Sequence, residues 1–162
     1  MVGAYLKMID GCEYVDYNVH LPGEGLKALG ELDVVGFKFD PPTAYICEVV
    51  THILGLLYGS SREVTIERIQ QKYERQKQYA AERLKQFKSN QHFMLWSPVV
   101  HEGYITEKLS QIQGLELIIN EEYAKRINEL QRLAAATSHN EGNPAFRLLQ
   151  ILGHTRKIGI EA

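Results

Sequence analysis

Two short apolar segments, each with a carboxylate inside it, constrain the fold of this 162-residue chain most strongly. Residues 31–36 read Glu-Leu-Asp-Val-Val-Gly and residues 45–51 read Tyr-Ile-Cys-Glu-Val-Val-Thr, on either side of a Pro-Pro pair. Such runs predict two antiparallel strands joined by a tight turn. A carboxylate on a buried strand is costly unless a partner or a cation satisfies it, so Asp33 and Glu48 are candidate metal ligands.

Strand geometry predicts how these two carboxylates are placed. With the two prolines at the tip, Asp33 is expected opposite Val50, and Val35 opposite Glu48. Opposed residues share a face of a sheet and diagonal neighbours come within about 7–8 Å, so both carboxylates would point to one side. They could then share Mg²⁺, which favours one or two carboxylates, several waters and phosphate oxygens. Glu31 has the same parity as Asp33 and would be either a third carboxylate or a solvent-facing residue.

At these positions the chain resembles the PD-(D/E)XK nucleases, the restriction-endonuclease-like superfamily, over roughly residues 1–100. The resemblance implies an α/β fold with a restriction-endonuclease-like core, in which helices flank a mixed central β-sheet. It also implies that Asp33 and Glu48 hold Mg²⁺ or Mn²⁺ and take part in catalysis. The motif lysine of the family is replaced here by Val50.

Some members of this family carry the displaced lysine on the following helix, which is predicted here over residues 62–88. An apolar stripe runs along it at helical spacing, formed by Ile66, Ile69, Tyr73, Ala80, Leu84 and Phe87. Lys72 lies at the edge of the stripe and is the first choice for the catalytic lysine, with Lys77 second. Gln76 and Tyr79 resemble the Gln/Tyr helix motif of the RecB-like branch. The alternative to a catalytic role is that the polar residues in the stripe simply extend their polar ends to solvent.

The remaining elements follow from periodicity and turn residues. Further helices are predicted over residues 3–9, 106–113, 121–136 and 145–152, further strands over 14–19, 92–100 and 114–120, and a loop over 20–30. The long connection through the helix predicts that strand 92–100 is parallel to the Glu48 strand. The chain is expected to be a single nuclease-like domain over residues 1–162, with a core over about 1–120 and a C-terminal helical extension over about 121–162.

Composition narrows the function classes. Residues 1–61 hold three Lys/Arg against eight Asp/Glu, whereas residues 62–88 hold eight against four. The excess of basic residues beside the expected metal site would suit binding of a phosphate backbone. Alternatively, these residues form a solvated face of the helix. The two cysteines lack metal-ligand or disulfide-scaffold spacing, and there is no Gly-rich phosphate loop or Gly-x-Ser-x-Gly elbow. No signal peptide or membrane span is apparent, so a cytoplasmic protein is expected.

The leading prediction is a metal-dependent DNA nuclease that uses Asp33, Glu48 and Lys72. Cutting both strands takes two sites, which makes a homodimer one expectation. The alternative is a catalytically inactive module of the same fold that binds nucleic acid or a partner protein without cutting. Val50 favours this alternative, because an apolar residue in the lysine position removes a counter-charge from the carboxylates.

Overall fold

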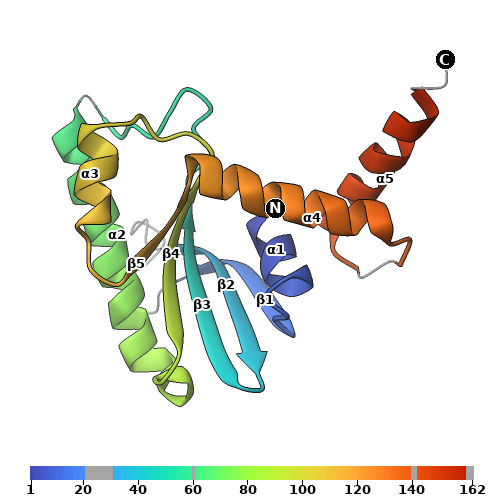
Figure 1. Cartoon of the computed structure of the whole chain (residues 1–162). Coiled ribbons are helices and arrows are strands. Elements are labelled where there is room, and N and C mark those ends of the chain that lie inside the picture. Colours follow the sequence, from blue (N-terminus) through green and yellow to red (C-terminus); the bar gives the residue numbers. More distant parts are fainter. Residues whose placement is uncertain (21–30, 60, 140–141, 160–162) are drawn as a thin grey trace.

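The computed structural model describes residues 1–20, 31–59, 61–139 and 142–159, and it shows an α/β fold around a five-stranded mixed sheet (Figure 1). The strands are β1 (Tyr14–His20), β2 (Glu31–Phe39), β3 (Pro42–Val49), β4 (Gln91–Ser97) and β5 (Leu115–Ile119). They lie in sequence order, with β1, β2 and β3 antiparallel and β3, β4 and β5 parallel. The predicted fold class, a mixed sheet flanked by helices, is confirmed. The predicted loop over 20–30 lies outside the described residues except for His20, which ends β1.

Helices cover both faces of the sheet. They are α1 (Val2–Met8), α2 (Arg62–Arg83), α3 (Tyr104–Ser110), α4 (Asn120–Ala136) and α5 (Pro144–Gly159). The core on one face joins α1 and α4 to the sheet, and the cores on the other face join it to α2 and α3. The fifth helix packs on α4 and projects away from the sheet (Figure 1). Within the described ranges, no helix is long and apolar enough to cross a membrane.

The long helix α2 begins and ends for local reasons. Its N-cap Ser61 accepts a hydrogen bond from the Val64 N–H at 3.3 Å, which satisfies one of the free donors of the first turn. The helix ends at Arg83, earlier than predicted, and a 3₁₀ turn over Lys85–Phe87 leads into β4. All six residues of the predicted apolar stripe are buried, which confirms that this face of α2 packs on the sheet.

The β2–β3 hairpin has a different register from the predicted one. Phe39 pairs with Pro42, so the turn is Asp40–Pro41 and not the two prolines. Proline is accepted as the first residue of a strand because its missing N–H is not needed there. The whole register therefore slips by two residues, and the predicted pairing of Asp33 with Val50 is wrong. A slip of two residues keeps every side chain on its original face.

We expect two isoleucines of the same segment to differ sharply in their contribution to stability. Ile46 on β3 is fully buried against α2, whereas Ile53, in the loop after β3, is 85% exposed. Ile46→Ala should lower the free energy of unfolding by about 2–5 kcal/mol through lost burial and a residual cavity. Ile53→Ala should change it by less than about 0.5 kcal/mol. Urea unfolding of the two variants measures both values, and equal losses would contradict this packing.

Candidate functional site

Two carboxylates meet where β2 and β3 separate. The ladder between these strands ends at the pair Val34–Cys47, although β3 continues beside β4 to Val49. Asp33 Oδ2 accepts a hydrogen bond from the Val49 N–H at 2.7 Å, so its side chain satisfies a donor beyond the end of the ladder. Glu48 is 4% exposed, and its side chain lies on the face of the sheet that α2 covers. The structure thus brings together the two carboxylates that the sequence predicted.

Lys72 reaches this pair from α2. Its Nζ donates a hydrogen bond to Glu48 Oε1 and forms an ion pair with it. Lys77 does not reach the site, because its Nζ pairs with Glu74 Oε1 at 2.6 Å and lies 4.6 Å from the centre of the Tyr73 ring. Of the two lysines that the sequence offered, the structure places only Lys72 at the carboxylates. Its part in catalysis stays a prediction.

Val50 lies in the apolar core next to the site. It is 3% exposed and belongs to a cluster with Ile69 of α2 and Leu95 of β4. Its N–H donates to the Trp96 carbonyl at 2.8 Å, which fixes the backbone just beyond Glu48. An ammonium at this position would be surrounded by apolar groups, whereas the position of Lys72 leaves its side chain about one-third exposed.

Electrostatics at the site favour a proton or a cation on Glu48. Burial, followed by the negative charge of Asp33, raises the pKa of Glu48 to about 7, and the opposing effect of Lys72 is smaller. A side-chain hydrogen bond between the two carboxyls acts in the same direction. Burial opposes charge on Lys72, but the charge of Glu48 and the hydrogen bond to it raise the pKa of Lys72. One ammonium therefore does not fully compensate two neighbouring carboxylates.

The loop between β3 and α2 adds residues that sequence reasoning had not assigned to the site. The Tyr58 ring centre lies 5.6 Å from Lys72 Nζ and 5.5 Å from the Arg68 guanidinium carbon. The His52 ring packs against the Tyr58 ring in a T-shaped arrangement, with 5.3 Å between the two ring centres. The Thr65 hydroxyl holds Tyr58 in place by accepting its N–H at 2.9 Å. Periodicity does not predict side-chain positions in such a loop. The sequence feature that could have indicated this contact is an aromatic residue, Tyr58, shortly before the basic helix α2.

Gln76 lies one helical turn beyond Lys72 on α2. It is 1% exposed, and neither its amide nitrogen nor its amide oxygen has a hydrogen-bond partner within the described parts of the chain. An unpaired buried amide costs about 1–3 kcal/mol. The predicted stripe therefore does contain a polar residue on the core-facing side, close to the turn that carries Lys72.

The donor set fits a hard divalent cation that keeps most of its waters. Among the described residues, no group of three or more His, Cys, Asp and Glu side chains is arranged to hold a metal ion. Glu31, the possible third carboxylate, is exposed. Two carboxylates remain, each with one oxygen engaged by the protein and the other available to a cation or a shared proton. Mg²⁺ is held by one or two carboxylates plus waters and substrate oxygens, so two are sufficient for it.

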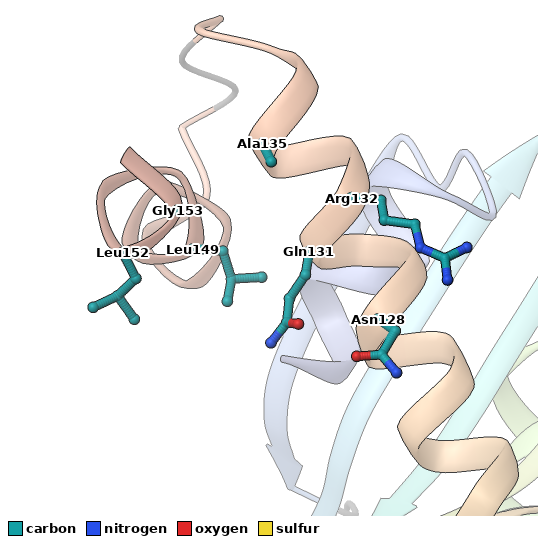
Figure 2. A pocket seen from close by; sticks show the side chains of 7 residues that line it. All are labelled: Asn128, Gln131, Arg132, Ala135, Leu149, Leu152 and Gly153. Atoms are coloured by element: carbon teal, nitrogen blue, oxygen red, sulfur yellow. The ribbon is translucent and has the colours of Figure 1, made fainter. Parts of the chain in front are cut away.

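A separate groove of about 480 Å³ lies between α4 and α5, away from these carboxylates (Figure 2). Leu149 points from α5 toward α4, and Gln131 and Asn128 line the α4 side. The groove contains no carboxylate, so its lining offers no ligand set for a divalent cation. The Asp33–Glu48 pair is therefore the stronger candidate for chemistry.

The raised pKa of Glu48 predicts a specific pH dependence of stability. Between pH 4.5, the ordinary pKa of the group, and about pH 7, its pKa in the folded protein, folding takes up a proton at Glu48. The contribution of Glu48 to stability is therefore fully present below pH 4.5 and is lost as the pH rises to about 7. The full effect is on the order of 3 kcal/mol. Urea unfolding of wild type and Glu48→Gln at pH 5 and pH 8 measures it as a difference. We expect the wild type to lose stability relative to the variant, and parallel pH profiles would contradict the assignment.

Comparisons with protein-family models, with curated proteins and with solved structures found no match to this chain. Its activity must therefore be inferred from chemistry that its own side chains support. Glu48 is the charged side chain that is buried among the described residues, and Asp33 and Lys72 lie next to it. These three side chains form the candidate functional site.

Proposed function

We propose that this protein is a metal-dependent nuclease that hydrolyses DNA phosphodiester bonds. The observation that carries the proposal is the contact of Lys72 with the buried carboxylate of Glu48, which lies beside the half-buried Asp33 where the hairpin ladder ends. Neighbouring carboxylates are stabilised by a shared proton or by a cation, and a divalent ion with open positions is what phosphoryl chemistry uses. The resemblance to the PD-(D/E)XK nucleases agrees with this arrangement, with Lys72 in place of a lysine at position 50.

Each side chain has a defined role in the proposed reaction. Mg²⁺ or Mn²⁺, when bound, supplies an acidified water and neutralises charge on the phosphate. Asp33 and Glu48 hold the ion, and the Val49 N–H keeps the Asp33 carboxylate oriented. Lys72 is a compact point charge that can move from Glu48 to a phosphate oxygen and stabilise the charge that develops there.

One flank of α2 is suited to a nucleic-acid backbone. At about 100° per residue, Arg68, Lys72, Arg75 and Arg83 fall within about 80° of one another around the helix axis. Three of the four acidic side chains of α2, Glu63, Glu67 and Glu74, fall on the opposite side from Lys72, whereas Glu82 lies at the edge of the basic flank. Much of the excess of base in residues 62–88 therefore lies in a basic row that passes beside the carboxylates at Lys72. Such a row supplies sequence-independent attraction to phosphates.

We expect cleavage of DNA to depend on Lys72 and not on Lys77. Purified protein is incubated with circular, linear and branched DNA in Mg²⁺ or Mn²⁺. Asp33→Asn and Glu48→Gln should abolish cleavage, and Lys72→Met should slow it by about 10²–10³-fold, as expected for loss of one charge-stabilising donor. Lys77→Met is the matched control, since it removes the same charge from the same helix away from the site. Cleavage that persists in Asp33→Asn or Glu48→Gln protein would refute the proposal.

A second function, DNA or protein binding without catalysis, is favoured by one observation. Lys72 already neutralises Glu48 directly, so the pair satisfies part of its own charge without a metal. The family's strand lysine position is also filled by buried Val50. An inactive module would keep both features as structural elements.

Metal-linked stability separates the two functions. A true site should gain stability as RT ln(1 + [L]/Kd), about 2.7 kcal/mol at one hundred times Kd. We expect Mg²⁺ or Mn²⁺ at millimolar concentration to raise the melting temperature of the wild type. The gain should disappear in Asp33→Asn and persist in Lys77→Met. No response of the wild type up to about 10 mM metal would favour the inactive module.

A further inference from the structure

An apolar tip, formed by Ile53 and Leu54, projects from the loop between β3 and α2. The two side chains are 85% and 91% exposed. Full burial of such a side chain is worth about 1.5–3 kcal/mol, and the fold recovers almost none of it here. Figure 1 shows this loop beyond the end of the sheet where β3 ends and α2 begins. Two adjacent apolar side chains so fully in solvent suggest a surface that is buried when something binds.

The tip is held by fixed contacts on both sides. The Gly55 N–H donates to the His52 carbonyl at 3.2 Å and closes the turn, and the Leu56 N–H donates to the Val99 carbonyl at 2.9 Å. Leu56 itself is fully buried. Gly55 has a φ of +108°, and a Cβ there would lie 2.4 Å from His101 Nε2, so only glycine suits this position. The apolar tip is therefore a projection with anchored ends.

Contacts connect the tip to the candidate site. His52, directly before Ile53, touches the Tyr58 ring, and that ring lies beside Lys72. Lys72 in turn contacts Glu48. The same loop leaves the strand that carries Glu48 and enters the helix that carries Lys72. A strand of nucleic acid with one phosphate at Lys72 would meet the loop with its neighbouring nucleotides.

We propose that Ile53 and Leu54 pack against the bases of DNA next to the bound phosphate, as an apolar wedge at one base step. This inference rests on the proposed nuclease function and adds how the substrate is engaged. Apolar side chains of this size insert between base steps and unstack them. A stable protein interface needs about 800 Å² on each partner, far more than two side chains offer. Arg68 and Lys72 lie at the ring of Tyr58, which belongs to the same loop as the tip, so these cations would hold the backbone while the tip reaches the bases.

The test uses Ile53→Ser/Leu54→Ser and a control with the same dipeptide elsewhere, Ile151→Ser/Leu152→Ser on α5, whose residues are 49% and 45% exposed. Binding to a duplex that contains 2-aminopurine is measured by anisotropy and by base fluorescence, with Ca²⁺ in place of Mg²⁺ because it takes the same oxygen ligands. The wild type should brighten 2-aminopurine as bases unstack. The Ile53/Leu54 variant should bind about tenfold more weakly and lose the brightening, and the control should retain both.

The outcomes that contradict the wedge also show whether the nuclease proposal fails with it. Unchanged affinity and brightening in the Ile53/Leu54 variant would overturn the wedge and leave the nuclease proposal intact. A wild type that binds no DNA would overturn both. A variant that keeps its DNA affinity but loses self-association in analytical ultracentrifugation would assign the tip to a second copy of this chain. Thermal unfolding of every variant checks that the fold is retained.

Discussion

The burial of Glu48 next to Asp33 is the constraint on which this end of the molecule depends. A charged carboxylate in a sheet covered by a helix is costly, and a second one beside it raises the cost. Three features surround the two carboxylates: the β2–β3 ladder ends, Asp33 accepts a hydrogen bond from the Val49 N–H, and Lys72 of α2 donates one to Glu48. Each feature alone is ordinary. Together they place two acids and one base in contact at the end of a hairpin.

Helix α2 links the stability of the core to the geometry of this site. Its buried stripe, including Ile69 and Ala80, fixes the rotation of the helix on the sheet. That rotation aims Lys72 at Glu48 and leaves the more distant Lys77 on a different flank, about 140° away. Gln76 shows the cost of this arrangement, because its unpaired amide lies in the core-facing stripe. A hydrophobic residue there would serve the core better, so an amide at this position agrees with a polar requirement near the site.

Much of the fold was predictable because hydrophobic periodicity determines it. The errors arose where turn geometry sets the hairpin register and the end of a helix. Alternation on β2 and β3 placed Asp33 and Glu48 on one face, and a register error of two residues left that face unchanged. The sequence offered Lys72 first and Lys77 second, and the packing of α2 places Lys72 at the carboxylates and Lys77 beside Glu74. The contact of Tyr58 with Lys72 could not be read from the sequence, because a loop from 50 to 61 has no repeat that fixes side-chain direction. The end of α2 was placed too late because its apolar spacing continues through the 3₁₀ turn.

A lysine on the helix differs from a lysine on the strand in more than its position. At position 50 the backbone is bound to Trp96 and the side chain is enclosed by the core, so an ammonium there could not change partners. Lys72 sits on a flexible stem, partly exposed, and its contact with Glu48 competes with a proton and with any divalent cation. Under the proposed function, a divalent cation held by Glu48 would leave the ammonium free to pair with a phosphate oxygen. Among the described residues, Glu48 is thus shared between a proton and Lys72, so the protonation of this carboxylate sets how firmly the ammonium is held.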